Sequence, residues 1–162
     1  MNITDLYLTS FCEPERRDWD DIVRRIDSGD PIFRLYVLQH NSENIGFITL
    51  WRLPGTLYCE HFAIFRDLRD KGYGTAVIEE AIAMAGHNPL ALEVELPETS
   101  DEAAHRIRFY EKCGMTAMQD FPYWQPPYRK DLPEVPMMLM VSKPLADPTA
   151  FVMMLHTVVY NQ

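Results

Sequence analysis

Arg69-Asp70-Lys71-Gly72-Tyr73-Gly74-Thr75 is the most informative segment of this chain. It connects an apolar run at 62–65, typical of a strand, to a run with helical composition at 76–84. Two glycines one residue apart, between a strand and a helix, favour a loop whose backbone N–H groups converge on an anion, because no Cβ atom obstructs the approach. The helix N-terminus adds about half a positive charge, and Arg69 and Lys71 add whole ones. The segment predicts a site for a phosphate-bearing ligand.

The spacing of the glycines distinguishes between kinds of phosphate loop. The dinucleotide-binding fingerprint would need a third glycine where Val77 stands, and a P-loop would close with Gly-Lys-Ser or Gly-Lys-Thr. The pattern Arg-x-x-Gly-x-Gly after a strand instead resembles the acetyl-CoA pyrophosphate loop of the GNAT N-acetyltransferase superfamily. A purely structural turn is the alternative interpretation.

A second segment with the same resemblance follows downstream. A predicted strand, Leu90–Leu96, precedes a helix that ends Arg108-Phe109-Tyr110-Glu111-Lys112-Cys113-Gly114-Met115. This ending is similar to the superfamily's Phe/Leu-Tyr-Glu-Lys-x-Gly-Phe signature. The two segments occur in the expected order, and the resemblance covers residues 30–143.

Composition bounds the classes of function. A chain of 162 residues with 47% apolar and 24% charged residues is typical of one globular domain. A net charge of −9 disfavours nucleic acid as a partner, because phosphate binding needs clustered Lys and Arg. Apolar runs fall short of the roughly 18 residues that cross a bilayer, which disfavours a membrane partner. Three scattered cysteines, without metal-ligand spacing, favour reduced thiols, a cytoplasmic location and no metal.

Hydrophobic periodicity predicts the order of the elements. Helical spacing covers residues 2–12, and Pro14 is expected at the first position of a helix over 15–26. Strands are expected at 32–39, 45–51, 57–65, 90–96, 116–121 and 137–141, with a Pro- and aromatic-rich loop at 122–129. The order predicts an α/β domain with a mixed sheet, and the resemblance implies the GNAT fold, with a largely antiparallel central sheet and helices on both faces. The superfamily's usual first strand is expected to be absent or very short.

We expect residues 1–146 to form the acetyltransferase domain and residues 147–162 to form a C-terminal helical extension. Asp147 can cap this helix and Pro148 can take its first position. Its apolar residues extend most of the way round, so it needs burial on two sides. It would pack either on its own domain or on the partner in a homodimer.

The resemblance implies acetyl-CoA as the acyl donor. The pyrophosphate would be wrapped by Arg69, Asp70, Lys71, Gly72, Tyr73, Gly74 and Thr75. The backbone of Phe62, Ala63 and Ile64 would pair with the pantetheine arm, because in this superfamily the strand that holds Glu93 separates from its neighbour. Asp70 opposes the charge of the ligand and is expected to point to solvent. A backbone N–H near Ala63 would meet the oxyanion.

The resemblance also implies the catalytic groups. Tyr110 is the expected general acid for the departing thiolate. Glu60, in the strand before the glycine loop, is the leading candidate for the base. Strand alternation would place it on the side of Tyr58 and Phe62, opposite His61. His61, Glu95 and water remain alternatives for the base.

The acceptor pocket is expected to involve an aromatic group and its polar neighbours. The candidate substrate-binding residues are Trp51, Tyr123, Trp124, Gln125 and Tyr128. Aromatic rings in a Pro-stiffened loop can enclose an alkylammonium by cation–π attraction, or they can close the end of the core. Arg129 could hold a substrate carboxylate.

These observations predict an acetyl-CoA-dependent N-acetyltransferase that acts on a primary amine of a small molecule or peptide by direct attack in a ternary complex. The acidic net charge mildly favours a cationic acceptor. The alternative is a catalytically silent acyl-CoA-binding or interaction module with the same fold.

Overall fold

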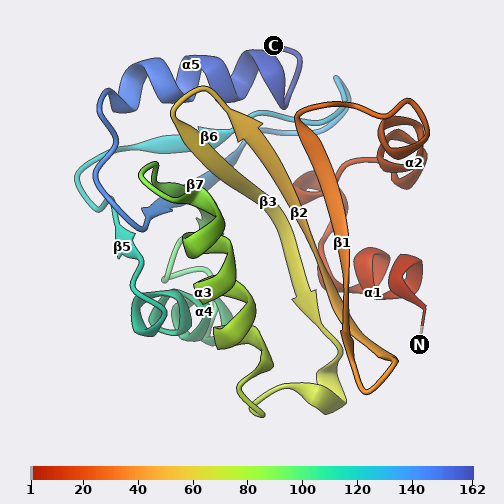
Figure 1. The fold of residues 1–162 in the computed structure, drawn as a ribbon. Coiled ribbons are helices and arrows are strands. Elements are labelled where there is room, and N and C mark those ends of the chain that lie inside the picture. The colour runs from red at the N-terminus through yellow and green to blue at the C-terminus, as the bar shows by residue number, and fades with distance from the viewer. Residues whose placement is uncertain (1) are drawn as a thin grey trace.

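The computed structural model describes residues 2–162, which form a twisted sheet with helices on both faces (Figure 1). The helices are α1 (Ile3–Ser10), α2 (Trp19–Asp27), α3 (Tyr73–Ala85), α4 (Asp101–Lys112) and α5 (Pro148–Val158). The strands are β1 (Phe33–His40), β2 (Glu43–Leu53), β3 (Thr56–Ile64), β4 (Leu90–Glu95), β5 (Thr116–Ala117), β6 (Tyr123–Gln125) and β7 (Val135–Val141).

The strand order is β1-β2-β3-β4-β7-β5, and β6 pairs with β7. Every pairing is antiparallel except that of β3 with β4. The parallel pair is joined through α3, as a crossover connection requires. The predicted α/β fold with a mixed, largely antiparallel sheet is confirmed, and the C-terminal helix is present.

The hairpin of β1 and β2 forms where the sequence predicts it. Asn41 and Ser42 connect the strands with φ values of 49° and 66°. Two successive residues with positive φ match the right-handed twist of the flanking strands. The hairpin delivers β2 in register with β3, the strand that leads into the glycine loop.

The predicted helix at 15–26 begins later than expected. Pro14 lies in a short 3₁₀ turn, Glu13–Glu15, and α2 starts at Trp19 after an extended Asp18. The side chain of Arg17 turns inward and donates to Glu60 and to the Val159 carbonyl oxygen. The extended backbone at Asp18 separates this buried arginine from the first turn of α2. A tertiary contact therefore delays the helix.

The region after α4 also differs from the prediction. The strand expected at 116–121 is limited to the two residues of β5, and the expected loop at 122–129 contains β6. In β6, Tyr123 and Gln125 are buried while Trp124 is 52% exposed. This alternation is that of a half-buried strand, and Pro126 follows directly because it cannot continue the ladder.

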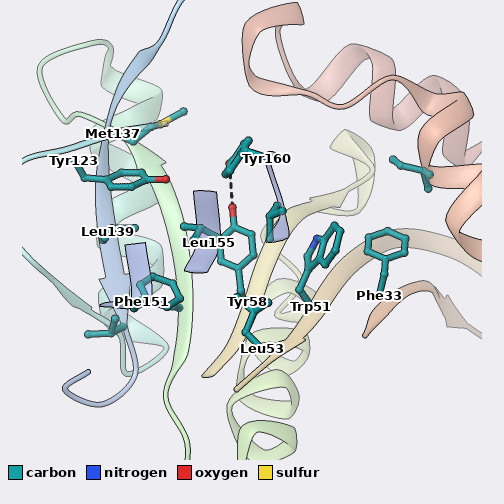
Figure 2. Close-up of a cluster of buried hydrophobic side chains, with 14 of the residues drawn as sticks. Phe33, Trp51, Leu53, Tyr58, Tyr123, Met137, Leu139, Phe151, Leu155 and Tyr160 are labelled. Atoms are coloured by element: carbon teal, nitrogen blue, oxygen red, sulfur yellow. Dashed lines mark hydrogen bonds between the residues drawn. The ribbon is translucent and has the colours of Figure 1, made fainter. Parts of the chain in front are cut away.

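Two hydrophobic clusters cover the two faces of the sheet. On one face α3 and α4 pack through residues such as Ile78 and Ile107. On the other face α1, α2 and α5 share a cluster with the sheet, which Figure 2 shows around Tyr58. Phe151 and Leu155 of α5 are buried in that cluster. None of the helices within residues 2–162 is long and apolar enough to cross a membrane.

Candidate active site

Two neighbouring strands separate at the middle of the sheet. β3 and β4 pair only where Leu57–Cys59 faces Leu90–Leu92. Beyond this point β3 remains paired with β2 alone, and β4 remains paired with β7 alone. The facing edges of the two strands are left without a strand partner, and a cavity of about 960 Å³ opens between them. The expected separation of the strand that holds Glu93 is present.

The glycine loop forms one end of this cavity. Gly72 precedes α3 with a φ of 83°, a conformation that residues with a Cβ rarely adopt. A Cβ on Gly74 would lie 3.1 Å from the Cζ atom of Phe109. The φ of Gly72 favours glycine there, and at 74 the absence of a Cβ permits the close approach of Phe109 on α4. A Cβ on Gly72 would meet no protein atom within 4 Å, so backbone conformation and not packing is the local reason for that glycine.

Most of the predicted cofactor-binding residues border the cavity, namely Phe62, Ala63, Ile64, Arg69, Asp70, Gly72, Gly74 and Thr75. Lys71 and Tyr73 do not border it; the Tyr73 ring lies 5.1 Å from that of His40, beside a separate cavity. Arg69 donates from Nε to the Ile64 carbonyl oxygen at 3.0 Å, which ties the loop to the end of β3. Asp70 is exposed, in the left-handed region with a φ of 61°.

Two further basic residues border the cavity. Arg66 begins the 3₁₀ turn Arg66–Leu68 after β3, and Arg108 lies on α4. Arg69, Gly72 and Gly74 border the same cavity. The cationic side chains and the N-terminus of α3 suit it to a ligand with several negative charges.

A β-bulge changes the face on which Glu60 lies. Thr49 pairs with His61 and the next residue, Leu50, pairs with Cys59, so Glu60 is the extra residue in β3. A bulge shifts the alternation of side chains by one position. The predicted placement of Glu60 opposite His61 is therefore wrong. Both side chains lie on the face of α1 and α2, while Phe62 packs on the opposite face.

Glu60 is fully buried and surrounded by donors. Arg17 donates to Oε1 from Nη2 at 2.9 Å and from Nε at 3.2 Å. Tyr128 donates to the same oxygen at 3.0 Å, and Trp51 donates from Nε1 to Oε2 at 2.8 Å. Burial acts to raise the pKa of Glu60, but the charge of Arg17 and the hydrogen bonds outweigh it and leave the pKa lowered. Glu60 is a stable carboxylate.

The two other side chains predicted as candidate bases also make contacts, although among residues 2–162 no hydrogen-bond partner reaches the buried Nδ1 of His61. His61 is buried, and its Nε2 lies 3.1 Å from the Glu15 carbonyl oxygen. Burial lowers the pKa of His61 against the opposing effect of Glu60, which keeps the ring neutral at pH 7. Glu95 pairs with Arg106 at 3.2 Å at the edge of the cavity.

Glu93 is the functional candidate that sequence reasoning missed. Its carboxylate accepts a hydrogen bond from Tyr123 on Oε1 and another from Tyr160 on Oε2 at 2.7 Å. Burial raises its pKa to about 7. It borders the cavity from β4. One signal was present in the sequence: a glutamate between Leu92 and Val94, inside a continuous apolar strand, is unusual for a surface charge.

Tyr110, the predicted general acid, borders the cavity from α4. It is buried beside Phe109, with ring centroids 5.1 Å apart. Burial raises the pKa of Tyr110 and the nearby Cys59 adds to the effect, so the phenol is protonated at neutral pH.

The predicted acceptor residues divide into different environments. Of the five, Gln125 borders the cavity, and it donates to the Pro14 carbonyl oxygen at 3.0 Å. Tyr123 and Tyr128 are held by the two buried glutamates, and Trp51 is fully buried in the core. Trp124 is exposed on the far side of β6. These rings mostly close the end of the core rather than form an open aromatic box.

Arg129, a possible holder of a substrate carboxylate, is already paired. Its guanidinium contacts Glu13, Asp18 and Asp131 at 2.6–3.2 Å on the surface. Among residues 2–162, no three His, Cys, Asp or Glu side chains are grouped so that they could hold a metal ion.

Comparisons with known proteins agree with this geometry. The family model described as the acetyltransferase (GNAT) family matches residues 1–115. An acetyltransferase of the GNAT family from Bacteroides thetaiotaomicron is 33% identical, with a TM-score of 0.88, and the match covers 99% of this chain and 90% of that chain. No functionally curated protein matches the chain.

Two more distant structures share the fold. An acetyltransferase from Bacillus subtilis in complex with CoA is 19% identical, with a TM-score of 0.58 over 90% of this chain and 94% of that chain. A GNAT family acetyltransferase from Elizabethkingia anophelis with acetyl-CoA bound is 17% identical, with a TM-score of 0.58 over 89% and 92% of the two chains. The cavity between separated strands, its glycine loop and these matches together establish that this chain belongs to the acetyltransferase (GNAT) family.

Proposed function

We propose that this protein is an acetyl-CoA-dependent N-acetyltransferase that acetylates a primary amine of a small molecule or peptide in a ternary complex. One observation supports this above the others. A single cavity joins a basic loop at a helix N-terminus to the buried carboxylate of Glu93, with Tyr110 on its wall. Membership of the family and the CoA-bound relatives support the choice of donor.

The donor would lie along the separated edge of β3. The backbone of Arg69–Thr75 would hold the pyrophosphate, with Arg66 and Arg108 adding positive charge. The pantetheine arm would hydrogen-bond to the unpaired backbone of Phe62–Ile64 in the manner of an added strand. A backbone N–H near Ala63 would then face the thioester oxygen, and one such donor contributes about 10²–10³-fold to the rate.

The cavity also has acidic residues on its wall. Glu15, Glu93 and Glu95 border it, together with Arg106, which pairs with Glu95. Burial and the charge of Glu95 raise the pKa of Glu15, which shows that these carboxylates influence one another. An amine that enters as an ammonium would relieve this repulsion, so we infer a cationic acceptor. Three free thiols fit a cytoplasmic protein.

Glu60 takes a positioning role in this proposal. Three hydrogen bonds, from Arg17 and Tyr128, converge on its Oε1, and one from Trp51 reaches Oε2. To act as a base it would have to give up the charge that pairs with Arg17. It instead fixes the side chains of Arg17, Trp51 and Tyr128 around one buried carboxylate.

Binding and turnover can be tested separately. Calorimetry with acetyl-CoA, CoA and ATP should show binding of the first two and none of ATP. A screen for thiol release over diamines, polyamines, aromatic amines and lysine peptides should then identify an acceptor. Binding of acetyl-CoA without thiol release for any amine would favour the silent module, and no binding of either thioester or CoA would reject the proposal.

Tyr110→Phe is expected to lower kcat by about 10- to 1000-fold, because the departing thiolate loses its proton donor. The KM for acetyl-CoA should change little, since only the hydroxyl is removed. Tyr36→Phe, on the exposed surface of β1, is the matched control and should leave kcat unchanged. Undiminished turnover in Tyr110→Phe would exclude this tyrosine as the acid.

A further inference from the structure

Two tyrosines from the C-terminal half of the chain hold the buried carboxylate of Glu93 at the cavity. We propose that Glu93 takes the proton from the acceptor amine, and that Tyr160, which follows α5, positions it. The inference rests on the proposed acetyltransferase function and assigns its base. It makes the C-terminal segment a working part of the active site.

The geometry leaves Glu93 able to receive a proton. Each carboxylate oxygen accepts one tyrosine hydroxyl, Tyr123 on Oε1 and Tyr160 on Oε2. Both partners are neutral hydroxyls, a third hydroxyl, that of Tyr58, lies close by, and Glu93 itself borders the cavity. Figure 2 shows the hydroxyl of Tyr123 directed from β6 into the core, and the hydroxyl of Tyr58 directed toward Tyr160. The two tyrosine hydroxyls of that second pair are 3.3 Å apart.

Glu60 lacks these properties although it lies nearby. Arg17 makes two hydrogen bonds to its Oε1, and the charge of Arg17 stabilises the ionised form and lowers the pKa of Glu60. A general base is instead most effective when its pKa lies near the working pH. Burial gives Glu93 a pKa of about 7. The two glutamates, on the two strands that border the cavity, therefore have different environments and different roles.

The groups that face Glu93 come from each element packed against it. β3 contributes Tyr58 and Glu60, β6 contributes Tyr123, the following loop contributes Tyr128, and Tyr160 follows α5. His156 of α5 packs its ring 5.7 Å from that of Tyr123. The tyrosine pKa values are raised by burial, so these phenols stay neutral hydrogen-bond donors at the pH where Glu93 titrates.

The proton balance follows from this arrangement. The acceptor enters as an ammonium and passes one proton to the Glu93 carboxylate. The neutral nitrogen forms a C–N bond with the thioester carbonyl carbon, and the C–S bond breaks as the intermediate collapses. The thiolate takes a proton from Tyr110, which recovers one from the acetylated nitrogen. Glu93 releases its proton to solvent, so each turnover releases one proton.

The test uses the acceptor found in the thiol-release screen and the full-length protein. In the unmodified protein we expect kcat/KM for the amine to decrease as the pH is lowered through an apparent pKa near 7, because the base must be deprotonated. This decrease is the acid limb of the pH profile. Glu93→Gln should lower kcat about 10²- to 10⁴-fold and abolish this acid limb, while the KM for acetyl-CoA stays within about twofold. Glu98→Gln, in an exposed turn, is the control and should be unchanged.

Tyr160→Phe separates positioning from mere packing. It removes one hydrogen bond to the charged form of Glu93, so the acid limb should move to higher pH. A purely structural tyrosine would lower the amount of folded protein without moving the limb. The proposal would be overturned if the acid limb survived in Glu93→Gln or disappeared in Glu95→Gln instead. It would also be overturned if the acid limb did not move in Tyr160→Phe.

Failure of the inference can be told from failure of the proposed function. A ¹³C carboxyl titration of glutamate-labelled protein needs no acceptor, and the Glu93 signal is assigned by its loss in Glu93→Gln. It should titrate near pH 7 and shift upward in Tyr160→Phe. Titration in the ordinary glutamate range would overturn the role of Glu93 even if turnover is intact. Absence of acetyl-CoA binding would reject the function itself.

Discussion

Replacing Arg17 by methionine is expected to lower the free energy of unfolding by about 3–5 kcal/mol, because it leaves a buried carboxylate without its partner. Arg17 and Glu60 have side-chain exposures of 4% and 0%. Methionine keeps the apolar part of the side chain, so the loss measures the missing charge and its hydrogen bonds rather than a large cavity. Urea unfolding at pH 7 gives the difference directly.

The pH dependence identifies the cause of this loss. The pKa of Glu60 is lowered in the folded protein, so its pairing contributes stability above the unfolded pKa, and this contribution is lost as pH falls through the folded pKa. In Arg17→Met the folded pKa should rise through burial, and the difference from the unmodified protein should shrink toward acid pH. Adding Glu60→Gln to Arg17→Met should recover part of the stability.

Arg24→Met is the matched control for this prediction. Arg24 pairs with Asp21 on the surface of α2, where its side chain is 72% exposed. Exposed pairs of this kind contribute about 0–1 kcal/mol. A loss in Arg17→Met no larger than in Arg24→Met, or one that does not change with pH, would contradict the ion-pair explanation.

Removal of residues 147–162 is expected to prevent cooperative folding. Phe151, Leu155, Val159 and Tyr160 are between 0% and 4% exposed in the cluster that covers one face of the sheet. Burial of such side chains contributes about 1.5–3 kcal/mol each, and together they are comparable to the roughly 5–15 kcal/mol of a typical domain. Circular dichroism on heating should show no sharp transition in the shortened chain.

Met153→Ser tests the other side of the same helix. Met153 is 68% exposed, so its replacement should change the stability by less than about 0.5 kcal/mol. If the shortened chain instead unfolded like the full chain, α5 would be an appendage to the domain. Light scattering of the full chain and of Met153→Ser would show whether the exposed side of α5 contributes to a homodimer.

Local sequence patterns were sufficient for most of the fold. Alternation of apolar residues located the hairpin strands, and the predicted helical run at 76–84 lies in α3, which begins three residues earlier at Tyr73, so that Gly74 is in its first turn. Asp147 caps α5, with its Oδ1 accepting from the Ala150 N–H at 3.0 Å, as the Asp-Pro pair predicts. These signals are local because they depend on the backbone conformation of a few adjacent residues.

The start of α2 and the strand β6 could not be predicted from such local patterns. α2 begins late because Arg17 turns inward to a residue 43 positions away. β6 is only three residues long and is defined by its pairing with β7, so its rings and prolines indicated a loop. Short strands of this kind have little periodicity of their own.

The sequence alone indicated the family, the glycine loop and the position of Tyr110 on a helix, because each depends on residues close together in the chain. Only the tertiary structure decided the protonation state of the carboxylates of Glu60 and Glu93. A single bulge in β3 brings Glu60 onto the face of the sheet where Arg17 lies. Tyr160, which follows α5, brings its hydroxyl to Glu93. Proton affinity depends on burial and on donors contributed by distant segments, which no local pattern encodes.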